Sequence, residues 1–358
     1  MRKNKRKLRF FIGLSNPAGI GTSYASILRS LGYQASCVTY WPHSFGYEKG
    51  NSNDFSLNLD QKPKILRPIY LLGYFIKSLF TYDVFIFLFG DTFWLFKNRY
   101  FTNLDLPILK LFNKKIVMTF VGCDIRYRHS QHYCCQGCQI KCDNCLKKQV
   151  ALGAQKYADL ILAQEDYAEL LGKAQYGNLW IPFNLNQYRP SYATHSEPIV
   201  LHAPSDQGIK GTKHLQKAVL RLKKEGFRFQ FKIMEKKPHH VILEELERAD
   251  IVVDSLYGGW YGVFAAESLA FGKVVLGYLN PEVIRKKHLN PPMINVDSKN
   301  IYEKLKMVLK MKPEERLAQA KKGRRFIENY HDGQKIVKKI LRNLDVSSLR
   351  SYNEKRRK

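Results

Sequence analysis

Residues 250–278 read DIVVDSLYGGWYGVFAAESLAFGKVVLGY, and this stretch decides the fold. An apolar, β-branched run ends in a turn rich in glycine and aromatic residues, a small apolar helix follows, and a second apolar run begins at Lys273. Strand, turn, helix and strand in this order predict a βαβ unit, whose two strands lie parallel. One carboxylate, Glu267, lies inside the apolar helix, and carboxylates are seldom buried without a partner or a function.

The same alternation of strands and helices extends along the chain in both directions. Strands are expected at residues 8–14, 34–41, 83–90, 115–122 and 159–164, and a second series starts at residue 198. WIPFNLNQYRP, residues 180–190, interrupts the pattern with prolines and asparagines and indicates a linker. The fold class is therefore α/β, with two Rossmann-like domains facing each other across a cleft.

The expected domains follow from that linker. Residues 1–185 form the first, residues 186–332 the second, and residues 333–358 a C-terminal helix that packs back towards the first domain, followed by a basic tail. Ligands of open α/β sheets bind beyond the carboxyl ends of the strands, so the cleft is the expected site.

The net charge of +28, from 59 Lys and Arg against 31 Asp and Glu, indicates a polyanionic partner. Nucleic acid is disfavoured, because the basic residues are spread along the chain and no known RNA- or DNA-binding pattern occurs. No run reaches the roughly 18 apolar residues of a membrane span, and the N-terminus lacks the apolar region of a signal peptide. The expected location is cytoplasmic, peripheral on the inner face of the cell membrane.

Residues 62–80, KPKILRPIYLLGYFIKSLF, place basic residues around an aromatic, apolar helix. This pattern suits contact with an anionic membrane surface. It equally suits a helix that covers the core and has a solvated basic edge. The sequence does not decide between the two interpretations.

Two loops have the composition of anion sites. HAPSDQGIKGTKHL, residues 202–215, runs from a strand through glycines into a helix expected near Thr212, and Lys210 adds a positive charge. An ordinary βα loop with an exposed lysine is the alternative. In the opening stretch, Gly262 permits close approach of a ligand to the backbone, and the N–H groups of Val263 and Phe264 start the next helix. A carboxylate one turn further on suits a ribose diol.

Here the chain resembles a family. GWYGVFAAESLAFGKVV is similar to the E-x-F-G-x-x-x-x-E-A-x-A-x-G-x-P-V signature of GT-B glycosyltransferases of family 4. NPAGIGTSYASILRSLGY resembles its first glycine loop and IKGTKHLQKAV its K-G loop. KYADLILAQ, IPFNLNQYRP and ENYHDGQKIVKKIL resemble further family segments in the family's order, so the similarity covers nearly the whole chain.

The resemblance implies a glycosyltransferase, in most such enzymes a retaining one, that needs no metal for chemistry. It would move a sugar from a nucleotide-sugar donor to a glycan or lipid-linked acceptor in surface polysaccharide biosynthesis. Glu267 would bind the ribose hydroxyls and Lys210 the donor phosphates. The other implied donor-binding residues are Gly19, Gly21, Gly262, Val263 and Phe264.

Three positions depart from the family pattern. Gly259 stands where the first glutamate is expected, Ser205 replaces an arginine, and Val121 replaces a histidine. Asp124 and Arg126, close to Val121, are kept as candidate catalytic residues. The departures leave open a catalytically degenerate protein that binds a polyanion or a partner, and also another nucleotide-sugar enzyme of this fold, such as an epimerase.

A cysteine-rich loop, HYCCQGCQIKCDNC at residues 132–145, is the other local signal. Cys135, Cys138, Cys142 and Cys145 follow a C-x2-C-x3-C-x2-C spacing that suits a structural, tetrahedral zinc site. An iron–sulfur cluster, a disulfide and reduced, unliganded thiols remain alternatives. Four thiolates leave no open position on zinc for a substrate, so the metal would have no catalytic role.

Overall fold

The computed structural model describes residues 7–47, 51–94, 103–122, 124–125, 144–164, 171, 175–176, 181–192 and 195–344. The chain divides into two compact units, with boundaries after Asn184 and His331. Of the described residues, the first unit contains those up to Asn184 and those from Asp332 onwards, and the second contains the residues between them.

The first unit is built on a seven-stranded sheet in the order β3-β2-β1-β4-β5-β6-β7, in which every pair is parallel. The central strands are apolar on both faces, as expected where helices cover a parallel sheet on both sides. The strands are β1 (Arg9–Leu14), β2 (Gln34–Thr39), β3 (Phe55–Ser56), β4 (Val84–Leu88), β5 (Lys115–Thr119), β6 (Leu160–Ala163) and β7 (Gln175–Tyr176).

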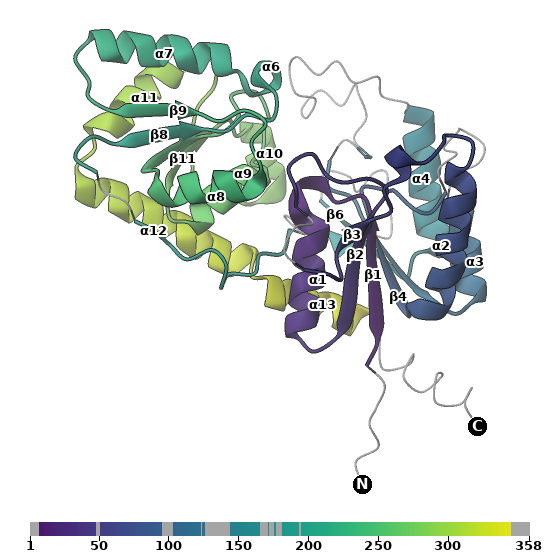
Figure 1. Ribbon diagram of the computed structural model, residues 1–358. Coiled ribbons are helices and arrows are strands. Elements are labelled where there is room, and N and C mark those ends of the chain that lie inside the picture. The colour runs from purple at the N-terminus through teal and green to yellow at the C-terminus, as the bar shows by residue number, and fades with distance from the viewer. Residues whose placement is uncertain are drawn as a thin grey trace. The chain divides into compact units, whose positions relative to one another are not determined.

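Helices flank this sheet. They are α1 (Ile20–Ser30), α2 (Arg67–Thr81), α3 (Asp105–Leu111), α4 (Asn144–Tyr157) and α13 (Gly333–Asn343), with short 3-10 turns η1 (Pro17–Gly19) and η2 (Leu59–Gln61). Helix α13 packs beside α1, whose Ile27 lies against Gly333 (Figure 1). The core of the unit lies between the sheet and α2, α3 and α4, and its members include Phe11, Phe85 and Leu106.

The second unit has a five-stranded parallel sheet in the order β12-β11-β10-β8-β9. Its strands are β8 (Ile199–His202), β9 (Gln230–Ile233), β10 (Ile251–Val253), β11 (Val274–Gly277) and β12 (Ile294–Asn295). Its helices are α6 (Gln207–Lys210), α7 (Thr212–Lys224), α8 (His239–Arg248), α9 (Val263–Ala270), α10 (Pro281–Lys287), α11 (Ile301–Lys310) and α12 (Pro313–Tyr330). Helix α7 packs on α11 and α9 packs on α12 (Figure 1).

Both sheets contain a topological switch point, where successive connections leave in opposite directions. It lies between β1 and β4 in the first unit and between β8 and β10 in the second. Loops that leave the carboxyl ends of such neighbouring strands form the ligand crevice of α/β sheets. The loops after β8 and β10 are the ones that hold Lys210 and the turn before Glu267.

The structure confirms the expected α/β class with parallel strands. Helix α3 ends at Leu111, and Asn113 just after it adopts a positive φ of 54°. In the described part of the chain, no helix has both the length and the apolar character needed to cross a bilayer.

Candidate functional site

The carboxyl edge of the second sheet gathers the residues singled out in the C-terminal half. The loop after β8 leads into α6 and α7, the loop after β9 into α8, and the turn after β10 into α9. Strands β8 and β10 flank the switch point, and the backbone ties the loops that follow them together, since Leu256 N–H donates to the Lys210 carbonyl over 3.1 Å. Gly211 lies close against the Leu256 side chain.

Lys210 ends α6, and its ammonium group lies directly at the switch point. Its Nζ is 2.5 Å from Oδ1 of Asp254, the residue that follows β10. Asp254 is buried, whereas about one fifth of the Lys210 side chain remains exposed. The pair has no net charge, so Lys210 does not present an isolated cation to a phosphate. Because an ammonium group has three donors, a ligand can still share it with Asp254.

The turn that opens the quoted stretch ends at Gly262, the N-cap of α9. Helix α9 starts at Val263, as the sequence predicts, and no side chain caps its first turn. Gly262 has extended backbone, with φ −105°, and a Cβ built on it would meet no described atom within 4 Å. Nothing within the described chain therefore requires glycine here, and the first N–H groups of α9 stay available to an anion.

Gly259 differs from Gly262 in conformation. Its φ of 70° lies in the left-handed region, and its carbonyl accepts a hydrogen bond from Asn280 N–H over 2.8 Å, which fixes the turn. A residue with a side chain is strained there by roughly 1–2 kcal/mol. The family signature expects a glutamate at this position, so the local backbone of this chain supplies a physical reason for the missing carboxylate.

Substitution of these two glycines by alanine should affect stability and nucleotide binding differently. We expect Gly259→Ala to lower the free energy of unfolding by about 1–2 kcal/mol, because alanine disfavours a positive φ. We expect Gly262→Ala to leave that free energy unchanged or slightly higher, yet to weaken nucleotide binding, because the new methyl group stands where a ligand approaches the backbone. Urea unfolding followed by circular dichroism, with calorimetric titration of UDP, measures both effects. Equal destabilisation by the two variants would contradict the assignment.

Glu267 lies one turn inside α9 and is 3% exposed. Its Oε1 accepts hydrogen bonds from the Tyr188 hydroxyl over 3.2 Å and from His239 Nε2 over 2.7 Å. His239 is the first residue of α8, so two helices that start at the same sheet edge meet through this contact. Both bonds use the same oxygen, and the described residues place no donor on Oε2.

Tyr188 is itself held in position. Its ring packs edge-on against Phe271 at 5.5 Å between centroids, and its carbonyl accepts a hydrogen bond from Arg324 Nη1. The same Arg324 nitrogen donates to the Ala270 carbonyl at the end of α9 over 2.8 Å. Helix α12 therefore fixes the position of Glu267 through Tyr188 and through the end of α9.

His202, the last residue of β8, holds the loop that contains Lys210 in position. Its Nδ1 lies 2.7 Å from the Val253 carbonyl and its Nε2 lies 2.8 Å from the Thr212 hydroxyl. Burial lowers the pKa of His202, so the ring is neutral, with Nδ1 donating and Nε2 accepting. The histidine thus joins the ends of β8 and β10 to the start of α7, and its role is to position the Lys210 loop.

The first glycine loop, after β1, is occupied by the chain itself. Asn16 Oδ1 accepts from Gly21 N–H over 2.8 Å and from Thr22 N–H over 3.4 Å, which caps the start of α1. The ring of Tyr47 lies over Gly19, at 2.7 Å from the position of an added Cβ. Close packing therefore accounts for Gly19 and Gly21, which the resemblance implies as donor-binding residues, and the N–H group of Gly21 already has an acceptor.

Neither a protein-family model nor a curated protein matches the sequence. Solved structures do match over nearly the whole chain. HepE from Anabaena in complex with UDP-glucose has a TM-score of 0.61 at 10% identity, covering 94% of this chain and 99% of that one. Sucrose-phosphate synthase from Thermosynechococcus elongatus has a TM-score of 0.62 at 14% identity, covering 96% and 100%. A glycosyltransferase from Rickettsia africae has a TM-score of 0.58 at 14% identity, covering 95% and 98%.

The chain has the GT-B fold. This confirms the fold that the sequence resemblance implied. Identities of 10–14% support the fold and nothing finer. Within the GT-B fold of this chain, Lys210, Asp254, Gly262 and Glu267 lie in the second unit, whereas Gly19, Gly21 and Asp124 lie in the first.

Asp124 follows β5, at the carboxyl edge of the first sheet. Its two carboxylate oxygens accept from the N–H groups of Val121, over 3.0 Å, and Gly122, over 2.7 Å. The carboxylate therefore closes the turn that contains Val121. Burial raises the pKa of Asp124 to about 6, although these hydrogen bonds act in the opposite direction.

This shift predicts a pH dependence. Because the folded pKa lies above the ordinary value of 3.8, the fold favours the protonated form. The stabilising contribution is present below pH 3.8 and is lost as the pH rises through 6. We expect the free energy of unfolding of the wild type, relative to Asp124→Asn, to fall by about 2 kcal/mol between pH 4 and pH 7.5. Urea unfolding at a series of pH values tests this, and a pH-independent difference would contradict it.

Several predicted residues lie outside the described part of the chain. These are Arg126 and the cysteine side chains proposed for zinc, Cys135, Cys138, Cys142 and Cys145. Within the described residues, no group of three or more histidine, cysteine, aspartate or glutamate side chains could hold a metal ion. The catalytic role of Arg126 and the zinc site stay predictions.

Proposed function

We propose that this chain is a glycosyltransferase that transfers a sugar from a nucleotide-sugar donor to a glycan or lipid-linked acceptor, with retention of configuration, in surface polysaccharide biosynthesis. One observation supports it above all others. In the second unit the uncapped start of α9 and the buried Glu267 lie within one helical turn of each other. N–H groups suit the phosphates and a carboxylate suits the ribose diol.

The chemistry of the proposed reaction requires stabilisation of the leaving nucleoside diphosphate. Helix N-termini and a shared lysine provide fixed positive potential without a metal ion. Lys210, held by Asp254 over 2.5 Å, would donate to the developing negative charge. The fold similarity to HepE, which was solved with UDP-glucose, makes UDP-glucose the first donor to test.

The test is a donor screen by calorimetry on the full chain, using UDP-glucose and other UDP- and GDP-sugars, followed by product analysis. Binding at micromolar affinity and transfer of the sugar to an acceptor are the expected results. Absence of binding to every donor would refute the proposal. Release of an isomerised sugar without transfer would indicate an epimerase instead.

A second candidate is a degenerate GT-B protein that binds a polyanion or a partner. Two observations favour it: the net charge of +28, and a backbone at Gly259 that disfavours the family's first glutamate. Under this alternative the protein would bind heparin-type polyanions, and the variants Glu267→Ala and Lys210→Ala would bind these polyanions as well as the wild type does. Under the first proposal the same variants lose donor affinity.

The proposal includes a peripheral place on the inner face of the cell membrane and a structural zinc ion at Cys135, Cys138, Cys142 and Cys145. The zinc part is supported by cysteine spacing alone. Elemental analysis of the purified chain, beside a Cys138→Ser variant, tests it: one zinc per chain, lost in the variant, is expected. Absence of metal in the wild type would refute it.

A further inference from the structure

Helix α2 carries two apolar stripes. Leu71, Phe75 and Leu79 are buried in the core of the first unit. A neighbouring stripe of the helix is also apolar but exposed: Ile69, Leu72, Ile76 and Phe80 recur at helical spacing and are each at least half exposed, as is Ile65 just before the helix. A helix that only covered a core would present polar residues there, so this outward stripe calls for a partner.

Helix α3 continues the same surface. Leu104, Ile108 and Leu111 are exposed at spacings of four and three residues, with Leu111 77% exposed. The Phe112 ring, just after α3, meets the Phe80 ring of α2 edge-on at 6.0 Å between centroids. The two stripes therefore form one apolar surface over α2 and α3, larger than the scattered single residues that ordinary surfaces show.

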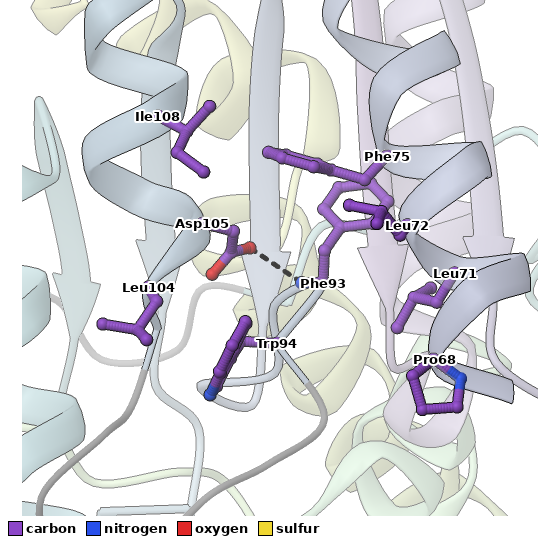
Figure 2. Close-up of a pocket in the computed structure, with 9 residues that line it drawn as sticks. All are labelled: Pro68, Leu71, Leu72, Phe75, Phe93, Trp94, Leu104, Asp105 and Ile108. Atoms are coloured by element: carbon purple, nitrogen blue, oxygen red, sulfur yellow. Dashed lines mark hydrogen bonds between the residues drawn. The ribbon is translucent and has the colours of Figure 1, made fainter. Parts of the chain in front are cut away.

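Between the two helices this surface opens into a pocket of about 390 Å³, shown in Figure 2. Leu72 and Phe75 of α2 line it on one side, Leu104 and Ile108 of α3 on the other, and Trp94 lies between them. Both helices begin at this end, so the pocket lies towards the carboxyl edge of the first sheet. Small-molecule sites occupy about 300–1,000 Å³, a range that includes this pocket.

The lining of the pocket is almost entirely apolar. Its one ionisable lining residue, Asp105, is buried, and its carboxylate accepts from Phe93 N–H and from the Thr92 hydroxyl, each over 2.8 Å (Figure 2). Those bonds hold the segment after β4 in place. An occupant therefore gains mainly from apolar contact, which favours a hydrocarbon chain over a sugar or a peptide with backbone polar groups.

Basic residues precede the end of α2 that lines the pocket. Arg67 is the first residue of the helix and the neighbour of the lining residue Pro68, and Lys62 and Lys64 lie in the segment that leads into it. Arg67 donates to the carbonyls of Asp60 and Lys62, and Lys62 Nζ lies 5.0 Å from the centre of the Tyr70 ring. Within the described residues none of the three basic groups forms an ion pair. Apolar surface bordered by unpaired basic groups complements an anionic lipid.

We propose that the pocket between α2 and α3 receives one hydrocarbon chain of an anionic membrane lipid. The lipid phosphate lies against Lys62, Lys64 and Arg67, and the two apolar stripes rest among neighbouring acyl chains. This deepens the membrane part of the proposed function, on which it rests, by assigning lipid contact to named residues. The donor site, in the other unit, does not enter the inference.

Tryptophan fluorescence tests it on the full chain. Vesicles of phosphatidylglycerol with dibrominated acyl chains quench a tryptophan that touches the chains. We expect strong quenching in the wild type and loss of at least half of it in Trp94→Phe. Phosphatidylcholine vesicles should bind at least tenfold more weakly. Undiminished quenching in Trp94→Phe would overturn the assignment to this pocket.

Substitutions separate the pocket from simple adsorption. Leu104→Phe narrows the pocket but keeps the surface apolar and adds no tryptophan, so vesicle binding should persist while quenching of Trp94 falls. Leu72→Glu with Ile108→Glu places charges at the rim and should weaken binding at least tenfold. Leu220→Glu, on the exposed side of α7, is the matched control and should change nothing.

Failure of this inference is distinguishable from failure of the proposed function. UDP-sugar binding is measured on the same samples, and it should be equal in all variants. Donor binding without any vesicle binding would overturn the lipid site alone. Concentration-dependent dimerisation that the rim glutamates abolish, again without vesicle binding, would show that a second copy covers the surface and would equally overturn it.

Discussion

Glu267→Gln is expected to weaken UDP binding by about 10- to 100-fold. A hydrogen bond to a charged group contributes roughly 1.5–3 kcal/mol, and each 1.4 kcal/mol corresponds to a factor of ten in affinity. Glutamine keeps the size of the side chain and one oxygen acceptor for Tyr188 and His239, so the local packing should persist. The loss should be nearly as large for uridine as for UDP, because the carboxylate is assigned to the ribose.

The matched control is Glu303→Gln, at an exposed position in the first turn of α11 in the same unit. Its affinity for UDP should equal that of the wild type. Tyr188→Phe removes one hydrogen bond of 3.2 Å to Glu267 but keeps the carboxylate itself, so it should weaken binding only a few-fold. Calorimetric titration gives the affinities, and thermal unfolding establishes that each variant is folded. A folded Glu267→Gln that binds UDP with wild-type affinity would make Glu267 a structural carboxylate.

The local features of this site could be predicted from the sequence. The start of α9 at Val263 follows from a glycine turn ahead of a small apolar run, and the apolar residues Leu269, Ala270 and Phe271 of that run are buried. These features depend on neighbouring residues and on the helical period. The βα pattern likewise predicted parallel strands, because it recurs in both halves of the chain.

The partners of the site residues could not be predicted in this way. Asp254 is 44 residues from Lys210, His239 is 28 from Glu267 and Tyr188 is 79 from Glu267. Each pairing depends on the order of the strands in the sheet. Strand β10 pairs with β8, although β9 lies between them in the sequence, because β9 occupies the edge of the sheet on the other side of β8. An aspartate that ends the apolar run IVVD was a usable signal for Asp254, since polar residues at the carboxyl ends of parallel strands face the ligand crevice.

The environment of helix α2 could not be predicted from the sequence either, for a different reason. The sequence left open a core-covering helix and a membrane-facing helix. In the structure Leu71 and Phe75 cover the core, while Ile69 and Ile76 are 66% and 50% exposed. Apolar residues on both sides of a helix blur the 3.6-residue pattern, so hydropathy alone could not separate the two faces.

Lys210→Met is expected to weaken UDP binding by about tenfold or more and to leave uridine binding unchanged. The reason is that Lys210 is assigned to the phosphates, where its ammonium group would donate to charged oxygens. The loss should shrink at high salt, because screening weakens the same attraction in the wild type. Lys210→Arg, which keeps the charge, should retain part of the affinity, and Lys213→Met, at an exposed lysine in the first turn of α7, is the matched control.

Asp254→Asn should change the affinity for UDP in the opposite direction. Asp254 neutralises Lys210 across 2.5 Å, so its removal leaves a net positive charge at the switch point and should strengthen UDP binding by about three- to tenfold. Stability should fall in Lys210→Met, because a buried carboxylate loses its partner, so affinities are measured well below each unfolding midpoint. Opposite effects of the two variants require that the ligand experience the charge of Lys210 itself. If both variants weaken UDP binding equally, the pair serves only to hold the turn. If neither variant changes UDP binding, the phosphates bind elsewhere.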